Sequence, residues 1–282
     1  CIMDYKQLKV KNILVAGHAG SGKTSLAEAM LYRTKTVDRQ GRVEDGNTVS
    51  DYDGEEAKRL CSLQSSILPY EYGDTKVNII DVPGLFDFEL GLYEGIKAAE
   101  TVLIAVSAKD GVEVGTQKAF RLAEKNRKST MIYVSKIDVE HADFYKVFEE
   151  LKTQFGPQIC PIVVPVARGN ETIYVNLMDF KAYQYKNGVA EEVVMPATGH
   201  RLDGLVTAIN EAVAETSEEL MEKYFSGEPL TKAEIVQGIK SGVKDGTICP
   251  VFCGDAHNTF AFDQLLNSLV WLEPTAADKG DE

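Results

Sequence analysis

Hydrophobic positions follow two different patterns along the chain, and the change falls near residue 155. Before it, short continuous apolar runs alternate with segments of helical periodicity. A continuous apolar run of about four to eight residues is typical of a buried parallel strand. These runs predict strands at 10–16, 63–72, 76–80, 101–106 and 130–134, and the periodic segments predict helices at 24–34, 91–100 and 115–127. The alternation predicts an α/β fold, with a mostly parallel sheet and helices on both faces.

After residue 155, strand-like segments follow one another without intervening helices. They occupy 159–166, 172–178, 181–186 and 191–195, and helical stretches follow near 201–223 and 231–242. The buried-strand pattern then resumes at 248–253, and a last helix is expected near 258–272. We therefore predict an α/β domain made of residues 1–155 and 249–282, into which an α+β subdomain, residues 156–248, is inserted.

Composition and charge exclude several classes of protein. Of the 282 residues, 44% are hydrophobic and 26% charged, which is ordinary for a globular domain. No apolar run approaches the length of a membrane span, and the N-terminus lacks the order of a secretory signal. The five scattered cysteines favour a reducing compartment, so we expect a cytoplasmic protein without membrane contact. A net charge of −13 disfavours a broad nucleic-acid-binding face, and no sequence-specific DNA binding is expected.

Residues 17–24 carry the clearest chemical signal. They lie between a predicted strand and a predicted helix and comprise Gly17, His18, Ala19, Gly20, Ser21, Gly22, Lys23 and Thr24. The spacing matches the G-x-x-x-x-G-K-[ST] phosphate-binding loop, in the strand–turn–helix context that this loop requires. Backbone N–H groups through Ser25 would surround phosphate oxygens at the start of the helix. Lys23 would reach the β- and γ-phosphates, and the Thr24 hydroxyl would bind Mg²⁺.

Three further motifs each follow a predicted strand. At the first, the Asp81 carboxylate could hold Mg²⁺ through water, while the backbone N–H of Gly84 could sense a γ-phosphate. The second is Ser135-Lys136-Ile137-Asp138, and the third is Asp255-Ala256, where a backbone N–H could contact the guanine O6.

Asp138 is the residue that discriminates between bases. The motif that contains it resembles the N-K-x-D motif of GTPases. The two carboxylate oxygens can accept from the N1–H and the 2-amino group of guanine, which adenine does not offer, so the wrong base leaves a polar group unpaired. The aliphatic stem of Lys136 can lie flat over the base. An ATP-using P-loop enzyme is the alternative, and it requires Asp138 to be incidental.

Two other clusters have simpler explanations. Cys249, Cys253 and His257 are spaced by four and suggest a metal, but a buried strand accounts for the cysteines without one. Acidic residues at 215, 218, 219 and 222 follow helical spacing and are expected to form a solvated face, with a docking surface for a basic ribosomal protein as the alternative.

The four motifs, in this order, resemble those of translational GTPases of the elongation factor G family. Residues 17–24 are similar to that family's G-H-x-x-x-G-K-T loop, and residues 81–88 to its D-T-P-G-H-x-D-F segment. Residues 211–224 resemble its inserted subdomain, and 249–254 resemble the strand that re-enters the GTPase domain. The resemblance covers essentially the whole chain, and 271–274 resembles the usual end of such a domain.

The resemblance implies the P-loop GTPase fold, GTP and GDP as ligands, Mg²⁺ as cofactor and hydrolysis to GDP and phosphate. It implies Thr24, Ser62 and Asp81 as metal ligands, and it assigns Lys23, Gly84 and the Leu85 position to hydrolysis. A longer protein with further domains would have the ribosome as its partner. We expect the isolated domain to be monomeric.

Several departures from the family pattern indicate a divergent elongation-factor-G-like protein. Ser62 occupies the position of a first-switch threonine. Gly20 occupies the position of an aspartate that is proposed to help hold a monovalent cation. Ser135 replaces an asparagine, and Leu85 replaces the histidine that would orient the attacking water. Two alternatives share the architecture: a ribosome-protection GTPase of the tetracycline-resistance type, and a GTP-dependent ribosome-binding module with little or no hydrolysis.

The first switch should be sensitive to the nucleotide. Residues 38–62 are polar, and the only anchor proposed for them is Ser62 on the metal. We therefore expect this segment to be mobile when no γ-phosphate is bound.

Overall fold

A computed structural model describes residues 9–49, 66–82, 89–196 and 200–272. Three of the candidate residues, Ser62, Gly84 and Leu85, lie outside these described residues. Among the described residues, no helix is long and apolar enough to cross a membrane.

The large sheet has seven strands in the order β2-β3-β1-β4-β5-β11-β6. Its members are β1 (Lys9–Gly17), β2 (Ser66–Tyr72), β3 (Thr75–Asp81), β4 (Thr101–Ser107), β5 (Ser129–Ser135), β6 (Ile159–Pro161) and β11 (Cys249–Cys253). Only the β2–β3 pair is antiparallel, so the prediction of a mostly parallel sheet is confirmed. Every residue of the central strands β4 and β5 is buried, which explains their continuous apolar sequence.

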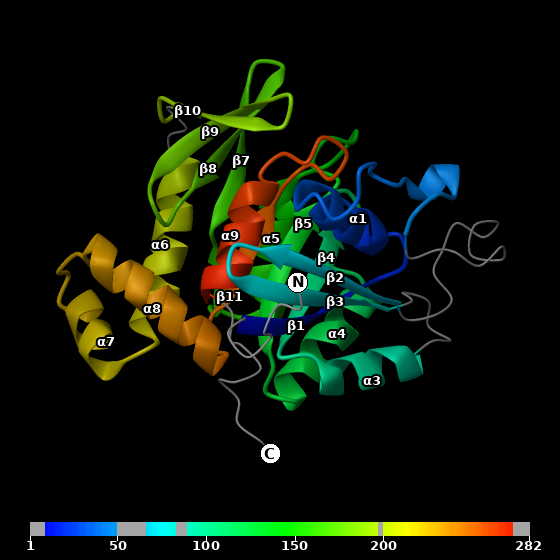
Figure 1. The fold of residues 1–282 in the computed structure, drawn as a ribbon. Helices are drawn as coiled ribbons and strands as arrows, with labels where there is room; N and C mark the ends of the chain where they lie inside the picture. The colour runs from blue at the N-terminus through cyan, green and yellow to red at the C-terminus, as the bar shows by residue number, and fades with distance from the viewer. Residues whose placement is uncertain (1–8, 50–65, 83–88, 197–199, 273–282) are drawn as a thin grey trace.

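Helices cover both faces of this sheet (Figure 1). On one face lie α1 (Lys23–Arg33) and α9 (Phe262–Leu272), which pack against each other. On the other face α3 (Glu89–Ala98) packs against α4 (Val114–Lys125). The buried ammonium of Lys11 on β1 donates to the carbonyl oxygens of Leu269 and Val270, at 3.0 and 2.7 Å, and so fixes the last turn of α9.

One helix was not predicted from the sequence. Helix α5 (Phe144–Phe155) buries Phe144, Val147, Phe148 and Leu151, which have helical spacing. The Asp143 carboxylate accepts from the Lys146 N–H at 3.1 Å and caps its first turn. The rings of Phe120 on α4 and Phe155 stack with centroids 4.0 Å apart, so α5 packs beside α4.

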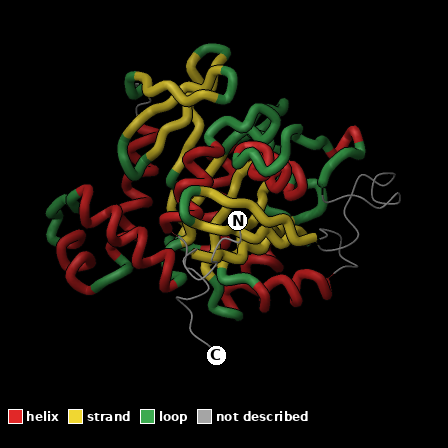
Figure 2. Tube along the Cα trace, viewed as in Figure 1, coloured by secondary structure: helices red, strands yellow, loops and turns green. Residues whose placement is uncertain are grey.

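A second, antiparallel sheet has the strand order β10-β9-β8-β7. Its strands are β7 (Val163–Arg168), β8 (Glu171–Asn176), β9 (Lys181–Lys186) and β10 (Val189–Val193). Helices α6 (His200–Ala214), α7 (Glu218–Phe225) and α8 (Lys232–Asp245) follow. In Figure 2 this sheet is at the top and its helices are at the left, both outside the large sheet.

Two predicted elements are each divided in the structure. The strand expected at 159–166 is two strands, because β6 pairs with β11 in the large sheet while β7 begins the small one. Between them Ile162 bonds to both sheets: its N–H donates to Val251 at 2.9 Å and its carbonyl accepts from Leu177 at 2.8 Å. The helix expected at 201–223 is α6 and α7, since Ser217 begins a new helix by accepting from the Leu220 N–H at 3.3 Å.

A glycine pair tests the packing of α6 against α8. A Cβ on Gly238 of α8 would lie 2.6 Å from Val213 Cγ1, whereas one on Gly204 of α6 would meet nothing within 4 Å. We expect Gly238→Ala to lower the free energy of unfolding by about 1–2 kcal/mol, since overpacking exceeds the gain in helix propensity. Gly204→Ala should raise it by about 0.5–1 kcal/mol. Urea denaturation checks both, and equal stability of the two variants would contradict the packing described.

Candidate nucleotide-binding site

The predicted phosphate loop joins the end of β1 to the start of α1. Gly17 has φ of 143°, and a Cβ there would lie 2.5 Å from the Ala105 carbonyl oxygen, so no side chain fits. Gly22 adopts the left-handed conformation at the N-cap of α1, where no side chain among the described residues caps the helix. The first N–H groups of α1 are therefore available to an anion, as the sequence motif requires.

Lys23 folds back into this loop. Its Nζ donates to the His18 carbonyl oxygen at 2.9 Å, and only 7% of the residue is exposed. Burial lowers the pKa of the Lys23 ammonium, while the carboxylates of Asp81 and Glu113 act in the opposite direction. A buried cation at the mouth of an anion-binding loop is suited to phosphate, which would supply a close counter-charge.

The two candidate metal ligands within the described residues meet at the same place. Thr24 at the start of α1 donates through Oγ1 to Oδ2 of Asp81, at the end of β3, over 3.3 Å. Asp81 is only 2% exposed. A hydroxyl and a carboxylate are the hard oxygen donors that Mg²⁺ prefers, so the chemistry of the pair fits this ion.

The end of β5 is bonded directly to the phosphate loop. Ser135 Oγ donates to the Ser21 carbonyl oxygen at 2.7 Å, and Lys136 Nζ donates to the Gly20 carbonyl oxygen at 2.6 Å. Lys136 has φ of 55°, a strained conformation that turns the chain sharply out of the strand. Asp138, two residues on, is exposed. The structure thus brings the base motif and the phosphate motif together.

The Asp255 side chain organises its own loop. Its Oδ1 accepts from the N–H groups of His257 and Asn258, at 2.8 and 3.1 Å, and Oδ2 accepts from the Asn258 amide at 2.6 Å. The Asp255 N–H donates to Phe260 at 3.2 Å. The Ala256 carbonyl accepts from the Gln40 side chain at 2.6 Å. Asp255 therefore shapes the loop after β11, and it does so with its carboxylate and its N–H.

The contacts of three residues at this site were missed by the sequence analysis. The imidazole of His18 accepts from the Gly115 N–H at Nδ1 over 3.3 Å, and its Nε2 lies 3.3 Å from a Glu113 carboxylate oxygen, which ties the phosphate loop to α4. Gln40 reaches the loop after β11, and Glu28 accepts from the Gly41 N–H within the proposed first switch. No local pattern indicates these pairs, because the partners are far apart in sequence.

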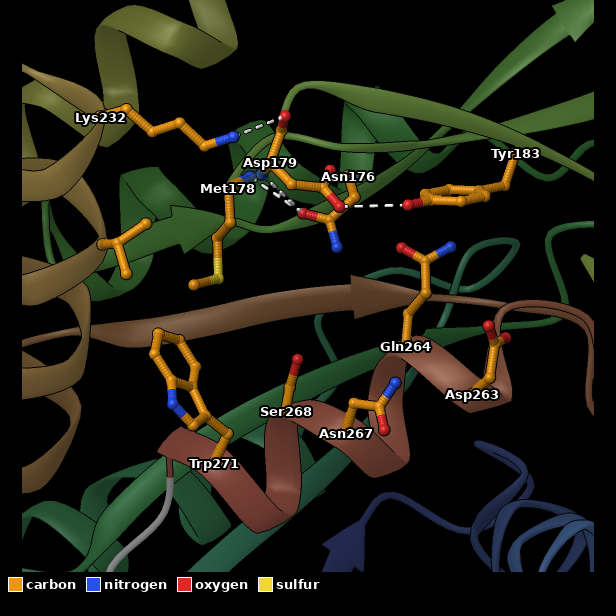
Figure 3. Close-up of a pocket in the computed structure, with 11 residues that line it drawn as sticks. Asn176, Met178, Asp179, Tyr183, Lys232, Asp263, Gln264, Asn267, Ser268 and Trp271 are labelled. Atoms are coloured by element: carbon orange, nitrogen blue, oxygen red, sulfur yellow. Dashed lines mark hydrogen bonds between the residues drawn. The ribbon is translucent and has the colours of Figure 1, made fainter. Parts of the chain in front are cut away.

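A cavity of about 360 Å³ lies apart from these motifs, between α8, α9 and the turn from β8 to β9 (Figure 3). In Figure 3 Gln264 projects from α9 toward Asn176 and Tyr183, and Trp271 projects toward Met178. None of the nucleotide motifs contributes to its lining. The carboxamide oxygen of Gln264 is buried and has no hydrogen-bond partner among the described residues.

The comparisons with known proteins agree with this geometry. A P-loop between β1 and α1, with an acidic residue at the end of β3, defines the class of P-loop nucleotide-binding proteins. Residues 8–275 match the family described as the elongation factor Tu GTP binding domain. The chain belongs to this family, and it is a GTP-binding domain of the translational GTPase class. The predicted family resemblance, fold class and GTPase assignment are confirmed at this level.

Individual relatives are also similar. An elongation factor G-like protein of Thermotoga maritima is 34% identical over 261 residues, which are 92% of this chain and 37% of that protein. A crystal structure of a protein from Thermus thermophilus superposes with a TM-score of 0.88 at 33% identity, over 96% of this chain and 41% of the other. The chain thus spans about two fifths of the length of these relatives.

Ser135→Ala tests the bond between the base and phosphate motifs. The change removes the donor to the buried Ser21 carbonyl, which should lower the free energy of unfolding by about 1–2 kcal/mol and weaken GDP binding several-fold. Calorimetric titration with GDP and thermal denaturation check the two effects. Ser129→Ala is a matched control, because Ser129 lies at the opposite end of the same strand and its hydroxyl donates to the Val243 carbonyl oxygen of α8, away from the phosphate loop. Equal loss of GDP affinity in both variants would contradict the assignment.

Proposed function

We propose that this domain is the GTP- and Mg²⁺-dependent switch of an elongation-factor-G-like protein that acts on the ribosome. The observation that carries the proposal is the convergence of Lys23, the Thr24–Asp81 pair and the Ser135–Lys136 turn on one loop. Charged and polar groups from the start of α1 and from the ends of β3 and β5 meet there, and the family membership supports guanine nucleotide as the ligand. The name of the Thermotoga relative supports the translational role. With the ribosome as partner, the protein would act in the cytoplasm.

Each part of the site has a separate role in this proposal. The N–H groups of residues 17–25 hold phosphate oxygens, and Lys23 neutralises charge on the β- and γ-phosphates. Thr24 and Asp81, with Ser62 from the first switch, would hold Mg²⁺, which when bound neutralises phosphate charge during transfer. The Gly84 N–H would couple the γ-phosphate to the second switch.

The guanine base would be held by the segments that follow β5 and β11. Asp138 would accept from the guanine N1–H and 2-amino group, and the Lys136 stem would cover one face of the base. Of the pair Asp255 and Ala256, the Ala256 N–H is the better candidate donor to O6, since the Asp255 N–H already donates to Phe260.

The domain boundaries also remain a proposal. Strand β6 belongs to the large sheet, so we place the start of the inserted subdomain at about residue 162 rather than 156. We place its end at residue 248, directly before β11.

Guanine selectivity should depend on Asp138. Asp138→Asn removes an acceptor for the 2-amino group and is expected to lower GDP affinity by at least about tenfold, because a buried donor is left unpaired. The same variant should gain affinity for xanthosine diphosphate, which presents an acceptor at the 2-position. Calorimetric titration with both nucleotides measures this exchange.

Glu140→Gln is the matched control, since Glu140 is in the same loop and its side chain is 89% exposed. It should bind GDP as the parent does. Unchanged GDP affinity in Asp138→Asn would show that this motif does not read the base.

Leu85 should limit the chemical step. A leucine cannot orient water, and positioning is most of what a protein contributes to phosphoryl transfer. We expect the parent to hydrolyse GTP at about 10⁻⁴ s⁻¹ or below without a partner. Leu85→His should leave GDP binding unchanged and raise turnover only with ribosomes present. Single-turnover assays decide the point: fast ribosome-stimulated hydrolysis by the parent would refute a limiting role for Leu85.

A further inference from the structure

Glu28 is a buried carboxylate that none of the nucleotide motifs includes. It lies in α1, one helical turn after Thr24, and 0% of it is exposed. Its Oε2 accepts from the Gly41 N–H at 3.1 Å, and its Oε1 accepts from the Val49 N–H. These two donors are eight residues apart in sequence, so one carboxylate closes a loop between them.

The loop from Gly41 to Val49 is shaped around this carboxylate. A Cβ on Gly41 would lie 2.7 Å from Glu28 Oε2 and 2.7 Å from the Thr48 Cα, so only glycine fits without displacing the chain. Within the loop, the Arg42 N–H donates to the Asn47 side chain at 2.7 Å. A short 3₁₀ turn, η1 (Val43–Asp45), completes it. The segment expected to be mobile therefore contains a folded part, and residues 50–62 lie outside the described residues.

This loop connects the two sides of the proposed nucleotide site. Gln40, the residue before it, donates to the Ala256 carbonyl in the loop after β11 at 2.6 Å. Glu28 belongs to the helix that begins with Lys23 and Thr24. Residues 41 and 49 are thus bonded to Glu28 of α1, the helix that follows the phosphate loop. Gln40 is bonded to the loop after β11, where the guanine base is proposed to bind.

The hydrogen bonds from residues 41 and 49 to Glu28 matter for stability because the Glu28 carboxylate is fully buried. Burying an ionised carboxylate is costly unless donors compensate it, so Glu28 and the two N–H groups stabilise the same conformation together. Removing the carboxylate leaves the buried Gly41 N–H without this acceptor, and removing the donors leaves a buried carboxylate with fewer partners. The loop is therefore expected to close over Glu28 as a unit.

We propose that Glu28 is a positioning residue for GTP binding and hydrolysis. It fixes residues 41–49, the part of the proposed first switch that the structure describes around it, against α1. This inference rests on the proposed assignment of that switch. GDP does not use the first switch as an anchor, so the effect of Glu28 should fall on the GTP-bound form.

The test is Glu28→Gln in the full-length protein, with GDP and a non-hydrolysable GTP analogue as ligands. The glutamine carboxamide has one acceptor oxygen for the two N–H donors of Gly41 and Val49, so its NH₂ group would face one of these N–H groups without forming a hydrogen bond. Affinity for the GTP analogue should fall about tenfold, while affinity for GDP stays within about twofold. Hydrogen exchange at the amides of Gly41 and Val49 should become faster.

Glu44→Gln is the matched control, because it makes the same change of charge on an exposed residue of the same loop. It should alter neither affinity. If Glu28→Gln lowers thermal stability but leaves the ratio of GTP-analogue to GDP affinity unchanged, Glu28 is only structural and the inference is wrong. If the parent itself binds no guanine nucleotide, the proposed function fails instead.

A second variant decides the case if Glu28→Gln does not fold. Gly41→Ala leaves the carboxylate in place and separates the Gly41 N–H from it by the added Cβ. The same selective loss of GTP-analogue affinity is expected. An unchanged affinity ratio in this variant, with normal folding, overturns the inference.

Discussion

The hydrogen bonds from the end of β5 to the phosphate loop are the interaction on which the nucleotide site depends. Ser135 and Lys136 hold the carbonyl oxygens of Ser21 and Gly20, so those peptide groups turn their oxygens away from the loop interior. The Gly22 N–H, in the same peptide group as the Ser21 carbonyl, can then face an anion, whereas the Ser21 N–H donates to the His18 carbonyl oxygen at 3.2 Å. The parallel sheet makes the contact possible, because β1, β3 and β5 all end at the same edge.

Buried charge is the second constraint on this edge. Lys23, Asp81 and Glu28 are each less than one tenth exposed, and each would be costly to bury alone. Lys23 bonds to the His18 carbonyl, Asp81 accepts from Thr24, and Glu28 accepts from loop N–H groups. Their partners come from different elements, so the charges hold the loop, the helix and the proposed switch in register with one another.

The inserted subdomain is joined to the GTP-binding domain by more than its two chain crossings. Ile162 bonds to both sheets, and the Tyr185 hydroxyl of β9 donates to Asp263 of α9 at 2.6 Å. Burial and the Asp263 carboxylate together raise the pKa of Tyr185, so it remains a donor at neutral pH. Helix α8 also packs against α9. Helix α9 thus contacts both the small sheet and α8 of the subdomain.

The sequence by itself determined the α/β class, the phosphate loop and the order of the motifs, because strand-sized apolar runs and glycine spacing are local signals. It also contained the helical spacing of α5, which was overlooked. Only the tertiary structure decided that 159–166 divides between two sheets, since both halves are equally apolar and the choice depends on pairing with β11 or β8. The same holds for Glu28, Gln40 and Glu113: a buried carboxylate or a surface amide acquires its role from partners distant in the chain, which no local pattern encodes.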